Sequence, residues 1–365
     1  MTVTTDRLDA LRAKMKDTGT DLVVLGPGAH LGWLLNVRPH ADERPCLAFV
    51  SQAGAGFLMP ALEAESARNQ TDLPFYEWPD DLGPEAALDR LLDALEAKSA
   101  AALVLDETMR ADHAALVTDA LPGATRRFTA DTVGALRMRK DEAEYAALKR
   151  NALIADTAMK AAWAVMRPGM TETQVADVVR DTFAQHEAKP LFTIVGAGPN
   201  GAYPHHHTGE TVLKSGDAVV MDIGAGSEGF SSDITRMALI GDGPEGYADV
   251  HAVVERAVQA ALAAARPGVK AHEVDDAARG VIAQAGYGDY FVHRTGHGLG
   301  TEVHEPPYIT ASSQSVLDEG MVFSIEPGIY LPGRFGIRLE EIVILRADGP
   351  EILSDLPRDV ERIDG

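Results

Sequence analysis

The chain has a single cysteine, Cys46, among its 365 residues. One thiol excludes a disulfide within the chain and a metal site built from several thiolates. Basic residues are also scarce, because 33 Lys and Arg stand against 55 Asp and Glu, a formal net charge of −22. Phosphate-rich surfaces repel such a chain, so we expect neither a nucleic-acid partner nor a membrane partner.

Long apolar runs are absent as well. No stretch approaches the roughly 18 uncharged apolar residues that a membrane span needs. Residues 1–16 are polar and charged and lack the apolar core of a signal peptide. We therefore expect a cytoplasmic protein, and the length of 365 residues predicts two domains.

The first third of the chain alternates short apolar runs with segments of helical spacing. The strand-like runs are 21–25, 46–50 and 101–105, and the helix-like segments are 8–15, 85–95 and 111–121. This alternation predicts an α/β domain with a central sheet over residues 1–136. Charge density rises at residue 137, just before a long helical pattern, so we place a second domain at 137–365.

The second domain contains an internal repeat. Arg167-Pro-Gly-Met-Thr-Glu-Thr-Gln-Val aligns with Arg266-Pro-Gly-Val-Lys-Ala-His-Glu-Val at an offset of 99 residues. Each copy follows a long helical pattern, ends it with Pro-Gly and begins another helix at Thr171 or Lys270. Two strand-like runs joined by a glycine-rich turn follow in each copy. A helix–helix–hairpin unit written twice predicts an α+β domain with a pseudo-twofold axis and facing sheets.

Each predicted hairpin carries a pair of acids. Asp222 and Asp233 fall roughly opposite each other in the first, and Glu326 and Glu340 are symmetric about residue 333 in the second. A lone Asp at a strand end usually caps a turn. Opposed like charges within apolar sequence instead destabilise a hairpin unless a counter-charge is present. Four carboxylates and one imidazole can hold two divalent metal ions about 3.5–4 Å apart, so we favour a metal site.

The imidazole is expected from the segment 291–307, which contains His293, His297 and His304. Its glycines permit a close backbone approach to a ligand. A dinucleotide site is the competing interpretation, but the G-x-G-x-x-G spacing is missing. The sequence also contains no H-E-x-x-H, which excludes the usual single-zinc protease helix.

A run of three histidines, His205 to His207, precedes the strand of Asp222. Such a run is often solvated surface, but its position suggests that one of the three could reach the metal site.

These residues resemble those of the metal-dependent Xaa-Pro peptidases, prolidase and aminopeptidase P, which share the pita-bread fold with methionine aminopeptidase and creatinase. The resemblance rests on Met221-Asp-Ile-Gly, Ser232-Asp-Ile-Thr-Arg, Thr295-Gly-His-Gly-Leu-Gly, Ile325-Glu-Pro-Gly and Ile337-Arg-Leu-Glu. It covers nearly the whole chain and implies a creatinase-type N-terminal α/β domain before a pita-bread catalytic domain. Leu31-Gly-Trp-Leu-Leu-Asn-Val departs from the Tyr-Leu-Thr-Gly type of segment that is usual in relatives.

The resemblance also implies roles for individual residues. The implied metal ligands are Asp222, Asp233, His297, Glu326 and Glu340. Of these, Asp233 and Glu340 would bridge two ions, and Glu326 would also move the proton. The implied substrate-contacting and organising residues are His205, His293, His304 and Arg338. The resemblance assigns no role to His206 and His207.

The implied activity is hydrolysis of the Xaa-Pro bond at the N-terminus of a dipeptide or short peptide, by a homodimer. The oxygen-rich ligand set favours two Mn²⁺ ions, with Co²⁺, Fe²⁺ and Zn²⁺ as alternatives. A second hypothesis is hydrolysis of another small amide or amidine, such as an ectoine-like or creatine-like compound, because one fold hosts several chemistries. A third is a peptide-binding pseudo-enzyme, against which the complete ligand set argues.

Overall fold

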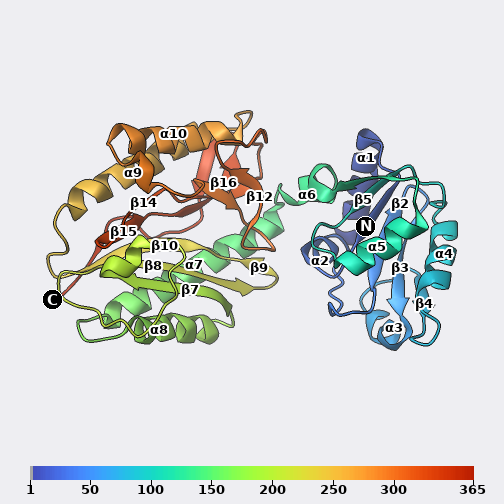
Figure 1. The fold of residues 1–365 in the computed structure, drawn as a ribbon, viewed down its shortest axis with the longest axis horizontal. Helices are drawn as coiled ribbons and strands as arrows, with labels where there is room; N and C mark the ends of the chain where they lie inside the picture. The colour runs from blue at the N-terminus through green and yellow to red at the C-terminus, as the bar shows by residue number, and fades with distance from the viewer. Residues whose placement is uncertain (1–2) are drawn as a thin grey trace. The chain divides into compact units, whose positions relative to one another are not determined.

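The computed structural model describes residues 3–365 and divides into two compact units, Met1–Arg137 and Met138–Gly365 (Figure 1). Every helix among the described residues is too short or too polar to cross a bilayer.

The first unit is built on a six-stranded sheet with the order β4-β3-β2-β1-β5-β6. Strand β2 runs antiparallel to both of its neighbours, and the other pairs are parallel. The strands are β1 (Leu22–Leu25), β2 (Leu47–Ser51), β3 (Ala55–Pro60), β4 (Phe75–Trp78), β5 (Ala102–Leu105) and β6 (Thr125–Phe128). The helices are α1 (Val3–Thr18), α2 (Ala29–Leu35), α3 (Ala61–Ala67), α4 (Glu85–Ala94), α5 (Ala111–Ala120), η1 (Thr129–Asp131) and α6 (Val133–Arg137).

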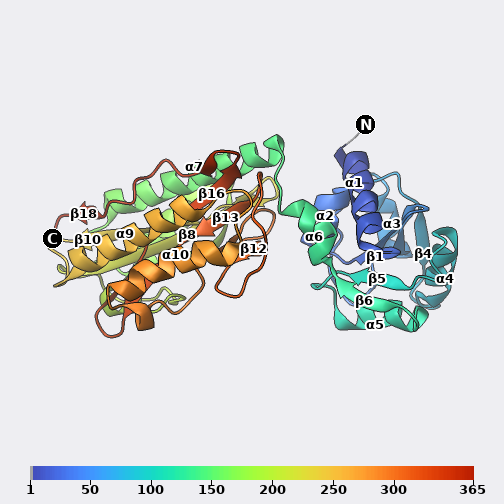
Figure 2. The same ribbon diagram turned by 90° about the horizontal axis from the view of Figure 1, so that it is seen from above.

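Strand β1 shows why this sheet is covered on both faces. Val23 and Leu25 pack into the core formed with α1 and α2, whereas Leu22 and Val24 pack into the core formed with α4 and α5. Successive side chains of a strand point to opposite faces, so a continuous apolar run is typical of a sheet with helices on both sides. Figure 2 shows helices flanking the sheet. The predicted α/β domain with a central sheet is confirmed.

The second unit contains two helix pairs and three sheets. Its helices are α7 (Glu142–Val165), α8 (Glu172–Gln185), η2 (Gly198–Ala202), α9 (Tyr247–Ala264), α10 (Ala271–Gln284) and η3 (Gly288–Tyr290). One sheet has the order β18-β10-β8-β7 with β9 paired to β8, another has β12-β11-β13-β16-β17, and β14 pairs with β15. The strands are β7 (Lys189–Ala197), β8 (Ala218–Ser227), β9 (Phe230–Ser231), β10 (Ile234–Ile240), β11 (Gly296–Gly298), β12 (Glu305–Ile309), β13 (Val322–Ile325), β14 (Gly328–Leu331), β15 (Phe335–Arg338), β16 (Glu341–Arg346), β17 (Gly349–Ile352) and β18 (Glu361–Ile363).

The backbone repeats itself at the two Pro-Gly turns. Gly169 and Gly268 have φ values of 90° and 91°, a region that glycine enters without a steric penalty. The Gly169 amide donates to the Leu213 carbonyl at 2.9 Å, and the Gly268 amide donates to the Leu317 carbonyl at 2.8 Å. The helices that follow begin after Thr171 and Lys270, as the sequence predicted. The duplication is therefore confirmed.

Apolar faces of the helix pairs pack on the sheets. Helices α7 and α8 share a core with β7, β8 and β10, and α9 and α10 share a second core with β13, β14 and β15 (Figure 1). The sheets consequently lie inside the unit with the helices outside, and the polar strand ends meet in its interior.

The two hairpins differ from the predicted pairing in one respect. Asp222 lies opposite Thr235, two residues beyond Asp233, so the two acids are diagonal neighbours and not directly opposed. The predicted symmetry of Glu326 and Glu340 is correct, because the pairs β13–β16 and β14–β15 keep one register on both sides of them. Both glutamates fall where this ribbon passes from one sheet to the other, a break that the sequence pattern did not show.

Candidate active site

One cavity of about 770 Å³ in the second unit collects the residues singled out by sequence. Its lining includes His205, Asp222, Asp233, His293, His297, His304, Glu326, Arg338 and Glu340. The remaining walls are largely apolar, with Leu191, Phe192, Ile194, Pro204 and Val303, and one further cation, Arg294. A concave site with apolar walls and a few convergent polar groups is typical of a small-molecule or peptide site.

The acids converge on His297. The His297 Nε2 atom lies 3.1 Å from Glu326 Oε1 and 3.7 Å from Asp233 Oδ2. Asp233, His297 and Glu340 each offer a ligand atom, and these atoms lie within 4.8 Å of one another. Strand β11 thus brings an imidazole to carboxylates of both hairpins.

The donor set fits a divalent cation. Asp222 Oδ1 and Glu340 Oε1 are buried atoms without a hydrogen-bond partner in the described chain, which is costly for carboxylate oxygens. Burial, and then the charges of neighbouring acids, raises the pKa of Asp233 and of Glu340 well above their usual range. His297 Nδ1 lies 3.1 Å from the Gly298 carbonyl, so Nδ1 donates to that carbonyl, and Nε2 is the ring nitrogen that faces the acids and is available to a metal ion. Positive charge placed among these oxygens relieves both the repulsion and the unmet hydrogen-bonding need.

Removing one charge tests this repulsion. In protein stripped of metal by a chelator, Glu340→Gln is expected to raise the free energy of unfolding at pH 8. The raised pKa means that folded protein holds the Glu340 proton more tightly than the unfolded chain does. Wild-type stability is therefore recovered as pH falls through the raised pKa, and the advantage of Glu340→Gln shrinks along the way. Urea unfolding from pH 8 to pH 5 measures this, and an advantage that is independent of pH would contradict it.

Arg338 organises one side of the cavity. Its guanidinium donates to Asp222 Oδ2, to Tyr330 Oη at 2.9 Å and to Thr235 Oγ1 at 3.0 Å. Thr235 Oγ1 in turn donates to Glu340 Oε2 at 2.7 Å. One buried arginine thereby orients a carboxylate from each hairpin.

The three cavity histidines are held differently. His293 accepts from Tyr330 Oη at 2.7 Å through Nε2 and donates through Nδ1 to the Arg294 carbonyl at 2.7 Å, so both ring nitrogens are engaged. His205 and His304 make no hydrogen bond to another residue in the described part of the chain. Partial burial, followed by the charges of His297 and Arg294, lowers the pKa of His304 to about 4. His304 is therefore neutral at pH 7 and free to offer an N–H to a ligand.

The glycines around His297 are required by the packing of the backbone. A Cβ on Gly296 would lie 1.9 Å from the Ser324 carbonyl oxygen, and one on Gly298 would lie 2.3 Å from the Pro306 carbonyl oxygen. These glycines therefore allow neighbouring backbone segments to approach closely. The predicted approach to a ligand stays a prediction.

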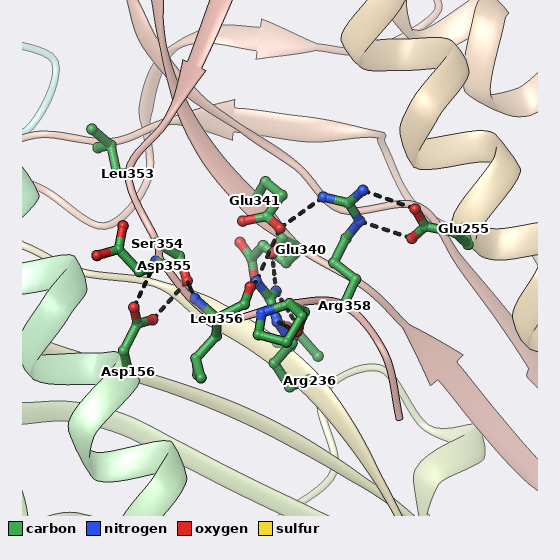
Figure 3. Close-up of polar contacts among 12 residues, drawn as sticks. Asp156, Arg236, Glu255, Glu340, Glu341, Leu353, Ser354, Asp355, Leu356 and Arg358 are labelled. Carbon is green, nitrogen blue, oxygen red and sulfur yellow. Dashed lines mark hydrogen bonds and ion pairs between the residues drawn. The ribbon is translucent and has the colours of Figure 1, made fainter. Parts of the chain in front are cut away.

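A buried network of charged side chains holds the backbone carbonyl of Glu340. Arg236 donates to the carbonyls of Leu356 and Pro357 at 2.8 and 2.9 Å, and also to the Glu340 carbonyl. Glu341 accepts from both Arg236 and Arg358, each at 2.9 Å, and dashed lines mark these contacts in Figure 3. The segment 353–358 is thus tied to the strands that carry the acids.

Sequence reasoning missed Thr235 and Tyr330. Threonine and tyrosine are common in strands, so neither hydroxyl stands out from the pattern. The available signal was position: Thr235 lies two residues after Asp233, and Tyr330 lies four residues after Glu326.

Comparison with known proteins now identifies the chain. Residues 146–347 match the model of metallopeptidase family M24, and residues 7–139 match the creatinase/prolidase N-terminal domain. The chain belongs to metallopeptidase family M24. It is a metallopeptidase, and membership of this family implies divalent metal ions.

Full-length relatives agree with this family. The chain is 39% identical over 361 residues to the probable dipeptidase PepE of Mycobacterium tuberculosis, with 97% of this chain and 95% of that protein covered. It is 31% identical over 357 residues to the Xaa-Pro dipeptidase of Pyrococcus furiosus, with 97% and 99% covered. The crystal structure of dipeptidase PepE from Mycobacterium ulcerans superposes with a TM-score of 0.94 at 37% identity, covering 100% and 98% of the two chains. The recombinant prolidase from Thermococcus sibiricus gives 0.91 at 30% identity, covering 100% of both chains. The expected M24 family, with its creatinase-type domain and pita-bread fold, is confirmed.

Proposed function

We propose that this M24 metallopeptidase hydrolyses the Xaa-Pro bond of dipeptides. The observation that carries the proposal is one cavity in which four carboxylates, one metal-facing imidazole and three further histidines line the same space. Two of the relatives are named a probable dipeptidase and an Xaa-Pro dipeptidase, and both names indicate dipeptide substrates.

Asp222, Asp233, His297, Glu326 and Glu340 would hold two divalent ions, Mn²⁺ being favoured by the oxygen-rich donors. Such ions, when bound, acidify water and polarise a carbonyl group. The homodimer and the cytoplasmic location stay predictions.

The protein residues supply the proton transfers. Burial would raise the pKa of Glu326, but the hydrogen bond with His297, followed by the positive charges of the site, lowers it to about 2. Glu326 is therefore a carboxylate at neutral pH and accepts the proton of the attacking water. It delivers that proton to the proline nitrogen as the C–N bond breaks. His205 and His304 line the same cavity and would donate to the negative charge that develops on the carbonyl oxygen as water adds to the carbonyl carbon.

The activity is tested with metal-stripped protein that is resupplied with Mn²⁺, Co²⁺, Fe²⁺ or Zn²⁺ in turn. Each sample is assayed on Ala-Pro, Ala-Pro-Ala, Ala-Ala and ectoine. We expect hydrolysis of Ala-Pro to return with metal and to be highest with Mn²⁺. Turnover of ectoine alone would favour the small-amide hypothesis, and no turnover with any ion would favour the pseudo-enzyme.

Arg294 would give the site its preference for dipeptides. Its guanidinium lines the cavity, stacks on the Tyr308 ring at 4.7 Å and has no acidic partner among residues 3–365. His304 packs against the ring of His297 with centroids 4.2 Å apart, and Arg294 lines the same cavity as these two histidines. An unpaired, partly desolvated guanidinium is suited to the free carboxylate that follows proline in a dipeptide.

Arg294→Met is expected to lower kcat/KM for Ala-Pro by about 100-fold, the loss of one charge-assisted pair. The uncharged amide Ala-Pro-NH₂ should lose less than about 3-fold, because it makes no such pair. Arg334→Met is the matched control, since Arg334 also stacks on an aromatic ring, Phe335, at 5.2 Å but does not line the cavity. Equal losses for the acid and the amide would contradict the assignment.

A further inference from the structure

A buried glutamate on α8 holds the loop that carries His205. The Glu172 side chain is 0% exposed and accepts four hydrogen bonds. Its Oε1 atom accepts from the Ala197 amide and from Asn200 Nδ2, both at 2.9 Å. Its Oε2 atom accepts from His206 Nε2 at 2.8 Å and from the Gly209 amide at 3.1 Å. All four donors belong to residues 197–209, so the Glu172 carboxylate holds this loop by hydrogen bonds at four of its residues.

The Glu172 carboxylate needs a donor for each of its four hydrogen bonds. A carboxylate that accepts four hydrogen bonds and donates none is satisfied only as the anion, and bonds to an anion are shorter and stronger than neutral ones. Leaving such a buried group short of donors costs the full desolvation penalty. The conformation of loop 197–209 therefore depends on the His206–Glu172 contact as well as on the sequence of the loop itself.

The three consecutive histidines lie in three different environments. His205 lines the cavity, His206 is 16% exposed and contacts Glu172, and His207 is exposed without a side-chain hydrogen bond or ion pair in the described chain. The residue before them, Pro204, offers its carbonyl to Arg338 Nη1 at 3.2 Å. His205 is thus fixed on one side by the arginine of the cavity and on the other side by the buried glutamate.

The far end of the loop is tied to edge strand β7. Thr208 Oγ1 accepts from the Val195 amide at 2.8 Å and donates to the Thr193 carbonyl at 3.1 Å. These bonds continue the β7 ladder with a side chain and prevent the loop from moving along the strand. Both ends of the loop and its centre are therefore anchored, and His205 is the member left facing the cavity.

We propose that Glu172 and His206 are positioning residues that hold His205 in reach of the substrate. The inference rests on the proposed function, because His205 acts there as a donor to the developing oxyanion. A catalytic donor displaced by about 1 Å can cost 100-fold in rate, so a rigid anchor for this loop is useful.

A double-mutant cycle tests the proposal with metal-loaded full-length protein on Ala-Pro. His206→Phe keeps a ring of similar size but removes the donor, and we expect kcat to fall about 10- to 30-fold with little change in KM. His206→Gln retains a donor at a similar reach and is expected to recover most of the rate. In the His205→Ala background, His206→Phe should cause no further loss, because it acts only through His205. A purely structural role would lower the rate in both backgrounds and would overturn the proposal.

His207→Phe is the matched control in the same loop. It should leave kcat, metal content and melting temperature unchanged, whereas Glu172→Gln should resemble His206→Phe, since an amide cannot accept all four bonds. A loss with His207→Phe equal to that with His206→Phe would contradict a specific anchor.

A structural measurement separates this inference from the proposed function. If metal-loaded wild-type protein fails to cleave every Xaa-Pro compound, the function fails, and the anchor is then judged from crystal structures of wild type and His206→Phe. We expect the His205 imidazole to move by about 1 Å or more while the acids of the cavity stay in place. An unmoved His205 would overturn the inference whatever the activity.

Discussion

Asp233→Asn is expected to lower kcat/KM for Ala-Pro by at least about 10³-fold and to remove metal binding at one position. Asn keeps the shape of the side chain but removes the charge and one acceptor oxygen. The ligand atoms of Asp233, His297 and Glu340 lie within 4.8 Å of one another. Removing the Asp233 charge therefore leaves His297 and Glu340 as an incomplete set of metal ligands. The stabilisation that metal gives to wild-type protein should fall as well, because a ligand bound at 100 times its Kd contributes about 2.7 kcal/mol.

Three measurements check this expectation. Metal content by elemental analysis should drop, the rise in melting temperature on adding Mn²⁺ should shrink, and activity should not return at high Mn²⁺. Asp181→Asn is the control, since this aspartate is exposed on α8 and does not line the cavity. Normal metal content with full Ala-Pro hydrolysis in Asp233→Asn would remove the basis of the proposed function.

The carboxylates of the site could be predicted because the internal duplication places a pair of acids in each of two equivalent hairpins. Glu326 and Glu340 keep the register that their symmetry about residue 333 implied, even though the ribbon breaks beside them. The placement of Asp222 was wrong by two residues, because a turn centre read from glycines does not fix the register of a hairpin. The spacing of the acids in the sequence therefore predicts which acids come together in the site. It predicts less reliably which residues pair across a hairpin.

Contacts that join distant segments could not be predicted in the same way. Glu172 meets His206 across 34 residues, and Arg338 meets Asp222 across 116 residues. Neither Glu172 nor His206 is distinguished by periodicity, since a glutamate in the first turn of a helix is ordinary. Only the folded chain shows that this glutamate is buried and that the second of three histidines turns away from the cavity.

Arg338→Met is expected to abolish activity and to destabilise the metal-free protein by about 3–5 kcal/mol, the cost of leaving a buried acid unpaired. The abandoned acid is Asp222, whose pKa is already raised by burial despite the neighbouring guanidinium. Tyr330 and Thr235 lose their shared donor at the same time. The variant therefore disturbs both hairpins and the hydrogen bond that orients His293.

Metal should offset much of this loss of stability. Divalent ions beside Asp222 supply the positive charge that Arg338 no longer provides, so the destabilisation measured by urea unfolding should be smaller with Mn²⁺ than with a chelator. Activity should stay low in both conditions, because the ions restore the charge but not the geometry of Tyr330 and His293. Arg338→Lys retains the charge without the planar fork and should fall between wild type and Arg338→Met in stability. Equal destabilisation with and without Mn²⁺ would show that Arg338 acts apart from the metal-binding acids.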